Sequence, residues 1–131
     1  MVRTVGVLCA TLALACGTAS AGTSLTITAR QSAGAPATTW TLRCAPASGT
    51  LPRPGFACLR LTRLAAPFAP VPRDRLCSQV YGGPQVARVR GIFRGRRVDA
   101  AFSRTNGCQT ARWNRVAFLF PIFAGTLPPP R

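Results

Sequence analysis

The chain of 131 residues contains no histidine and no lysine, and its only acidic residues are Asp74 and Asp99. A hydrolytic triad needs a general base to activate a serine or cysteine, and neither histidine nor lysine is present to serve as one. Chemistry by paired carboxylates would have to use the two aspartates. We place these on a loop and a strand beside arginines, where a salt bridge is the more natural role. These absences argue against an enzyme.

Metal and nucleotide sites also lack their usual residues. Without histidine or a Cys-x-x-Cys pair, the cysteines do not form the pattern of a zinc site. No glycine-rich phosphate loop is present, because Gly91 and Gly95 fall in a predicted hairpin with no helix after it. We therefore expect no metal and no cofactor, and a binding or inhibitory domain becomes the favoured class.

The amino terminus has the pattern of a secretory signal peptide over residues 1–21. A positively charged start precedes the apolar run Val5 to Ala15, and the small residues Ala19 to Ala21 form a cleavage site. The run is too short to span a bilayer, which takes about 20 apolar residues. A lipid-anchored form cut before Cys16 fits less well, because the usual leucine of a lipobox is missing. We expect a secreted, extracellular protein without a membrane span.

Removal of the signal peptide leaves four cysteines, Cys44, Cys58, Cys77 and Cys108. In an exported chain an even number of cysteines indicates disulfides, here two bridges with three possible pairings. The sequence by itself does not choose among the three. If neighbours pair, each closed loop contributes roughly 3 to 4 kcal/mol of stabilisation.

The mature chain is strongly basic, with sixteen arginines against two aspartates and a net charge of +14. Such a charge permits binding to polyanions, because each arginine can displace a counterion. Five arginines fall in one predicted hairpin and form a candidate basic stripe: Arg88, Arg90, Arg94, Arg96 and Arg97. The alternative interpretation is a GC-rich coding sequence and scattered, solvated arginines.

Alternation of apolar and polar residues predicts most of the strands. Ser24 to Arg30 and Thr38 to Cys44 alternate as half-buried strands do. Val86 to Phe93 and Val98 to Phe102 form a hairpin around an Arg-Gly-Arg turn. The apolar segment Arg115 to Phe120 is predicted as a fifth strand.

Helix and loop signals occupy the middle of the chain. Gly55 to Leu64 spaces its apolar residues as a short helix does, and the prolines after it end that helix. Arg73 to Pro84 shows neither the helical nor the strand period of apolar residues and is predicted as an extended, exposed loop. The expected fold class is α+β, with a five-stranded antiparallel sheet packed against two short helices and two disulfides.

Several segments resemble the Streptomyces subtilisin inhibitor family. The first runs from Thr41 to Pro46 and continues through the proline- and glycine-rich stretch to Cys58. The others are Cys77-Ser78-Gln79-Val80-Tyr81, the hairpin Gly91 to Val98, the corner Asn106-Gly107-Cys108 and the closing Val116 to Phe120. The likeness covers about Leu25 to Phe120, so we expect the inhibitor-like domain at 22–120 and a proline-rich tail at 121–131.

The resemblance implies bridges from Cys44 to Cys58 and from Cys77 to Cys108, and a homodimer formed through the sheet face. It also implies an inhibitor of subtilisin-like serine endopeptidases that offers a substrate-like loop. That reactive-site loop comprises Cys77, Ser78, Gln79, Val80 and Tyr81, with Gln79 entering the primary specificity pocket and Gln79-Val80 as the bond offered.

Elementary physics supports such a loop. A rigid loop binds at a lower entropic cost, and Cys77 anchors one side of it. Val80 is β-branched and favours the extended form. A bridge to Cys108 would bring the Asn106 amide close enough to support the loop backbone.

The loop departs from the family at Ser78, where proline is common, and at Gln79, where Met, Lys or Arg is usual. A neutral glutamine suits a tolerant subtilisin pocket better than the aspartate-based pocket of trypsin. We expect weaker inhibition than in a typical member, or a different protease target. The alternatives are a secreted arginine-rich polyanion-binding protein and a diverged scaffold without inhibitory activity.

Overall fold

The computed structural model describes residues 22–123. The predicted signal peptide and residues 124–131 of the proline-rich tail lie outside the described residues. Within that range four antiparallel strands form one sheet in the order β2-β1-β3-β4. The strands are β1 (Thr23–Arg30), β2 (Thr38–Cys44), β3 (Gly83–Phe93) and β4 (Arg96–Arg104).

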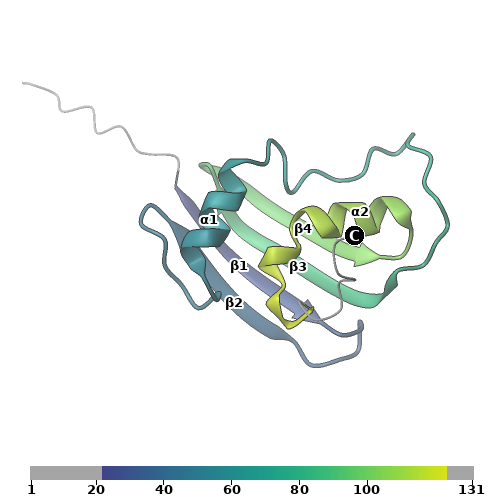
Figure 1. The fold of residues 1–131 in the computed structure, drawn as a ribbon, viewed down its shortest axis with the longest axis horizontal. Helices are drawn as coiled ribbons and strands as arrows, with labels where there is room; N and C mark the ends of the chain where they lie inside the picture. The colour runs from purple at the N-terminus through teal and green to yellow at the C-terminus, as the bar shows by residue number, and fades with distance from the viewer. Residues whose placement is uncertain (1–21, 124–131) are drawn as a thin grey trace, which may run out of the picture.

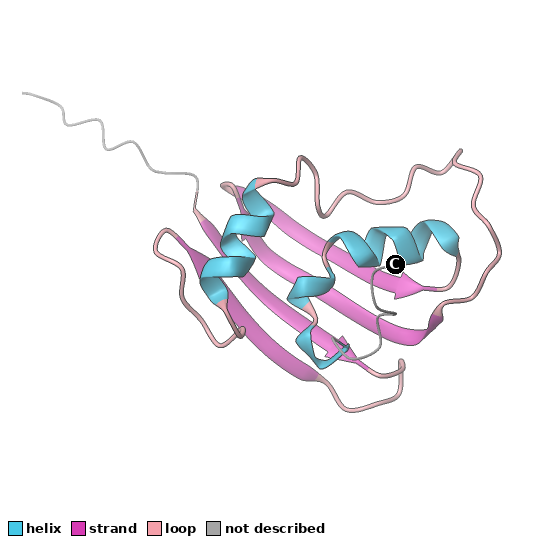
Figure 2. Ribbon diagram, in the orientation of Figure 1, coloured by secondary structure: helices cyan, strands magenta, loops and turns pink. Residues whose placement is uncertain are grey.

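Two helices cover one face of the sheet, as Figure 1 and Figure 2 show. They are α1 (Pro54–Thr62) and α2 (Gly107–Arg115), and the 3₁₀ turns η1 (Ala117–Leu119) and η2 (Pro121–Phe123) follow α2. The other face of the sheet, here called the open face, is covered by no helix of the described residues. No helix within residues 22–123 is long and apolar enough to cross a membrane. The α+β class, the antiparallel sheet, the two helices and the two disulfides are confirmed.

Period-two alternation places one apolar face of the sheet under the helices. Leu25, Ile27 and Ala29 are buried on β1, and the polar residues between them face the other way. The hairpin turn also follows its sequence signal, because Arg94 (φ 49°) and Gly95 (φ 77°) both take the positive φ of a type I′ connection.

The predicted fifth strand, Arg115 to Phe120, is wrong. Its first residue ends α2, and Ala117–Leu119 form the 3₁₀ turn η1. The burial pattern gives the reason: Trp113, Val116, Phe120 and Phe123 are buried at spacings of three and four, which is the period of a helix. A short apolar run does not by itself distinguish a strand from a buried helical segment.

The aromatic residues after α2 complete the core. The Trp113 ring lies 4.6 Å from that of Phe120 and 5.4 Å from that of Phe123, measured between centroids. Phe120 also packs edge-on against Phe102 of β4, at 5.6 Å. Phe123 is therefore part of this core.

Helix α1 is held by covalent and tertiary contacts more than by capping. Arg53 at its N-cap makes no side-chain capping bond, although Pro54 favours the first turn. The Cys44–Cys58 disulfide ties the helix to the end of β2. At its other end the Arg94 guanidinium donates to the Leu61 carbonyl at 2.9 Å. The Leu61 carbonyl also accepts from the Leu64 amide at 3.2 Å, so the arginine adds a second hydrogen bond at the helix end.

Asp99 lies on the open face of the sheet between two arginines. It accepts two hydrogen bonds from Arg88, at 2.7 and 2.9 Å, and one from Arg90 at 3.4 Å. The hydrogen bonds from Arg88, together with the nearby charges, lower the pKa of Asp99 to about 2. The expected salt bridge to neighbouring arginines is therefore present.

This pairing predicts a defined pH dependence. Because the pKa is lower in the folded state, the stabilisation from Asp99 is present above pH ~4 and is lost as the pH falls towards 2. In an NMR titration we expect the Asp99 carboxyl to titrate with a midpoint near 2, and Arg88→Ser to move the midpoint up towards ~3.9. An unchanged midpoint in that variant would contradict the assigned cause.

Candidate functional site: an exposed loop anchored on both sides

The segment between α1 and β3 runs over the helical face and then around the end of the sheet (Figure 1). Its tip, Ser78 to Tyr81, is exposed, with Val80 69% and Tyr81 63% accessible. Leu76, just before the tip, is 97% accessible. Large apolar side chains this exposed are more typical of a contact surface than of a packed loop.

A disulfide and a backbone hydrogen bond hold the first side of the tip. Cys77 is bonded to Cys108 in the first turn of α2. The Gly107 amide then donates to the Ser78 carbonyl at 2.9 Å. A Cβ on Gly107 would lie 2.1 Å from Ser78 Oγ, so the absence of a side chain permits this close approach.

The second side of the tip joins the sheet. The Gly82 amide donates to the Arg104 carbonyl of β4 at 2.7 Å, and Gly83 begins β3 opposite Arg104. A Cβ on Gly82 would lie 2.6 Å from Thr110 Oγ1 and 3.1 Å from the Arg104 carbonyl oxygen. The Gly82-Gly83 pair is thus part of an anchor.

Further back, Arg112 of α2 fixes the approach to the loop. Its guanidinium donates to the carbonyls of Ala69, at 2.8 Å, and Phe68, at 3.3 Å, and also to the Ala101 carbonyl on the edge of β4. Burial lowers the pKa of Arg112. One side chain therefore joins the incoming segment, α2 and β4.

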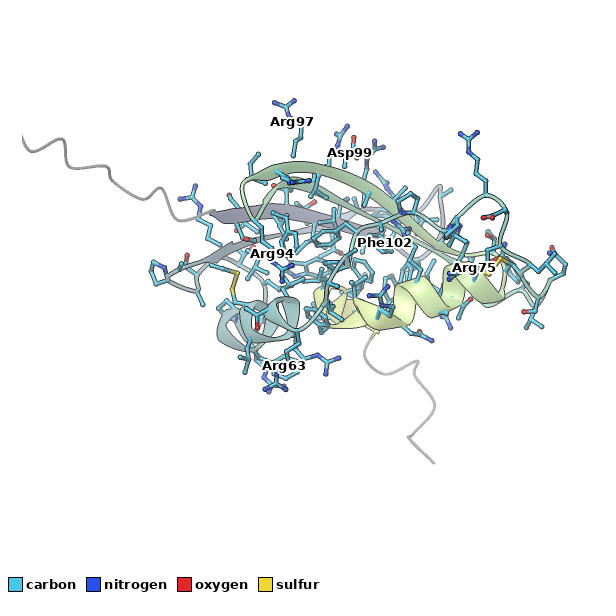
Figure 3. The ribbon with its side chains drawn as sticks, turned by 90° about the horizontal axis from the view of Figure 1, so that it is seen from above. Arg63, Arg75, Arg94, Arg97, Asp99 and Phe102 are labelled. Atoms are coloured by element: carbon cyan, nitrogen blue, oxygen red, sulfur yellow. A yellow bond between two sulfur atoms is a disulfide. The ribbon has the colours of Figure 1, made fainter. Side chains whose placement is uncertain are left out.

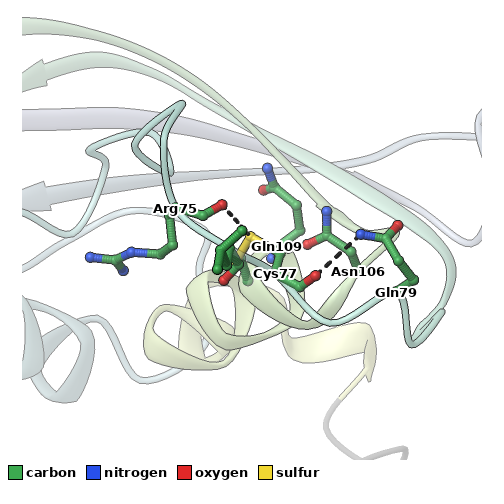
Figure 4. The surroundings of a disulfide bond; sticks show 7 residues. Arg75, Cys77, Gln79, Asn106 and Gln109 are labelled. Carbon is green, nitrogen blue, oxygen red and sulfur yellow. Dashed lines mark hydrogen bonds between the residues drawn. A yellow bond between two sulfur atoms is a disulfide. The ribbon is translucent and has the colours of Figure 1, made fainter.

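The Gln79 side chain lies along its own loop in this structure. Its Nε2 donates to the Cys77 carbonyl at 3.2 Å (Figure 4). Releasing the side chain from this position costs about 1 kcal/mol. Figure 4 also shows Asn106 and Gln109 on the α2 side of the disulfide, close to the loop.

The model of the family described as subtilisin inhibitor-like matches residues 10–107. This chain belongs to the subtilisin inhibitor-like family. The resemblance noted in the sequence is thereby confirmed, and both disulfides have the pairing that it implied.

Two relatives and one solved structure illustrate the family. Subtilisin inhibitor-like protein 1 of Streptomyces cacaoi is 33% identical over 61% of this chain and 76% of its own length. Kexstatin-1 of Streptomyces platensis is 34% identical over 53% of this chain and 50% of its own length. Streptomyces caespitosus sermetstatin, solved in complex with Bacillus licheniformis subtilisin, aligns at 28% identity with a TM-score of 0.46 over 72% of this chain and 96% of that one.

In this family member the Asn106 side chain caps α2. Its Oδ1 accepts from the Gln109 amide at 3.0 Å, while the loop backbone is bonded to the next residue, Gly107. Any support from Asn106 therefore acts through the position of the first helical turn. The start of this helix has a sequence signal that was missed, because Asn followed three residues later by Gln is a capping-box pattern. For Arg112 no local signal exists, since it is one arginine among many.

We expect Asn106→Ala to lower the free energy of unfolding by about 1 kcal/mol, because the N-terminal amides of α2 lose their cap. The same variant should loosen the Gly107–Ser78 contact and raise the exchange rate of the Gly107 amide more than that of core amides. Asn106→Asp keeps an accepting oxygen and is the control. Denaturant titration and hydrogen exchange measure both effects, and equal losses in the two variants would contradict the capping role.

Proposed function

We propose that this protein is a secreted inhibitor of subtilisin-like serine endopeptidases and not an enzyme. The observation that carries the proposal is an exposed tip, Ser78 to Tyr81, fixed on both sides by independent anchors. Family membership and the names of the relatives support the same function. Gln79 is assigned to the primary specificity pocket and Gln79-Val80 to the bond that the protease attacks.

The two anchors explain how a substrate-like loop can inhibit. If the Gln79-Val80 bond is cut, the end at Gln79 stays tied to α2 through Cys77–Cys108 and the Ser78–Gly107 bond. The end at Val80 stays tied to β4 through Gly82 and Arg104. Because the two ends remain close, resynthesis competes with release, as expected for groups held at a high effective concentration.

Neighbouring residues extend the proposed contact surface. Leu76 lies three residues before Gln79 and is almost fully exposed, so it can enter an apolar subsite of a protease that binds an extended chain. Ser78 lacks the fixed φ of proline, but its carbonyl is held by Gly107. The proposed contacts are therefore Leu76 and the residues Cys77, Ser78, Gln79, Val80 and Tyr81.

The homodimer implied by the resemblance stays a prediction. The proposed inhibition does not require it, because each chain carries its own complete loop with both anchors. One protease molecule is expected per chain.

Titration of subtilisin with purified, oxidised protein tests the function, with trypsin and chymotrypsin in parallel. We expect subtilisin activity to fall linearly to near zero at one chain per active site, and trypsin to be affected least. Full activity of all three proteases at a large excess of the protein would contradict the proposal and favour a diverged scaffold.

A further inference from the structure

The open face of the sheet carries an unusual set of side chains. In Figure 3, Arg97 and Asp99 project from this face, while Arg63 lies beyond the helices on the opposite side of the molecule. Alternation along the four strands assigns five arginines to the face, namely Arg30, Arg43, Arg88, Arg90 and Arg97. Among the strand residues that the structure describes, Asp99 is the only acid on the face.

The structure separates the five arginines of the predicted stripe. Arg88, Arg90 and Arg97 lie on the open face, but Arg94 turns towards α1 and donates to the carbonyls of Leu61 and Ala65. Arg96 follows the opposite side of β4 from Arg97, because neighbouring strand residues point to opposite faces. The stripe is therefore shorter than the hairpin, and it continues across the sheet to Arg43 on β2.

Little on this face neutralises the arginines. In the part of the chain that the structure describes, the ion pairs join Asp99 to Arg88 and to Arg90, and the contact with Arg90 is the longer one at 3.4 Å. Arg43 and Arg97 have no carboxylate within ion-pairing distance among residues 22–123. The face therefore keeps a large excess of positive charge.

The surroundings of the arginines suit a polymer that carries anionic groups at intervals. Arg88 and Arg90 are two residues apart on β3, about 7 Å along the strand, and Thr28 and Thr26 face them on β1. A guanidinium binds a sulfate or carboxylate through two parallel hydrogen bonds, and the threonine hydroxyls add donors and acceptors.

We propose that this open face binds an anionic polysaccharide, a sugar polymer bearing sulfate or carboxylate groups. Single-stranded nucleic acid fits less well, because such sites combine arginines with aromatic rings for base stacking. The outward-facing residues of the four strands include no aromatic residue. The homodimer that the resemblance implies would cover this same face, so it and the polysaccharide exclude each other. The dimer fits less well, since it would bring two arginine-rich faces together with few acids to pair them.

A matched pair of variants tests where binding occurs. Arg88→Ser/Arg90→Ser removes two charges from the open face, and Arg60→Ser/Arg63→Ser removes two exposed charges from α1 and its C-cap. The probe is a size-defined heparin oligosaccharide, titrated by calorimetry at several salt concentrations. For the open-face variant we expect affinity to fall about 10-fold at ~0.15 M salt and the salt slope to fall by about 2. The α1 variant should change affinity less than about 2-fold.

A third variant gives a change in the opposite direction. Asp99→Asn removes the acid that holds Arg88 and Arg90, so heparin affinity should rise severalfold. All three variants should inhibit subtilisin as the unchanged protein does, because the loop anchors lie elsewhere. The result is therefore independent of whether the proposed inhibition is confirmed.

Three outcomes would overturn the proposal. Equal losses in the open-face and α1 variants would mean that the net charge, and no defined face, binds heparin. Binding of single-stranded poly(dT) as tight as that of heparin, through the same arginines, would contradict the polysaccharide. In sedimentation experiments, a dimer that persists in heparin but dissociates in the Arg90→Glu variant would assign the face to a second copy.

Discussion

We expect Gln79→Lys to turn the protein into an inhibitor of trypsin, lowering its inhibition constant for that protease at least ~100-fold. The trypsin pocket is built around an aspartate, so a neutral glutamine leaves that charge unpaired and a lysine pairs it. Inhibition of subtilisin should change much less, because its pocket tolerates side chains of several kinds. Steady-state inhibition assays with both proteases measure the two constants.

Gln31→Lys is the matched control for this prediction. It makes the same chemical change and adds the same charge at an exposed position in the β1–β2 connection, outside the tip. The control should leave both inhibition constants unchanged. If Gln79→Lys gains nothing against trypsin, or if Gln31→Lys gains as much, Gln79 does not occupy the primary pocket.

The second large effect is expected at the disulfide beside the loop. Replacing Cys77 and Cys108 with serine removes one of the two anchors on the first side of the tip, so the cut ends should separate. We expect the Gln79-Val80 bond to be hydrolysed at least ~100-fold faster by subtilisin, and inhibition to become temporary. The free energy of unfolding should also fall by roughly 3 to 4 kcal/mol.

Replacing Cys44 and Cys58 with serine separates the loop effect from the loss of stability. This bridge joins α1 to β2, and its loss should cost a similar ~3 kcal/mol while both loop anchors remain. At a temperature where both variants are folded, only the Cys77/Cys108 variant should become a substrate. Mass spectrometry measures the rate of hydrolysis of each variant. Equal rates would show that resistance to cleavage comes from global stability and not from the local anchor.

The strands and the first helix followed from local sequence signals. Alternation in Ser24 to Arg30 predicts the buried face of the strand, and the glycine at position 95 predicts the hairpin turn, because both signals are local. The end of the chain is different, because the apolar run after Trp113 suits a strand or a helix equally well. Only its packing against Phe102 and the rest of the core selects the helical form.

The position of the candidate site could be predicted from the sequence, but the contacts that hold the loop in place could not. The loop residues came from the resemblance around Cys77 to Tyr81. The bonds from Gly107 to Ser78 and from Gly82 to Arg104 join residues that are distant in the sequence, and no local pattern signals them. Arg112 is likewise recognisable only once Phe68 and Ala69 are seen against α2.

The most direct test of the account is to determine which bond subtilisin cuts. The protein is incubated with a small amount of the protease until the mixture stops changing, and intact masses are then measured before and after reduction. We expect one cut, with a new amino terminus at Val80, and two fragments that stay joined by Cys77–Cys108 until the disulfides are reduced. A first cut elsewhere, or complete degradation with no stable cut form, would contradict the assignment of Gln79-Val80 as the reactive bond.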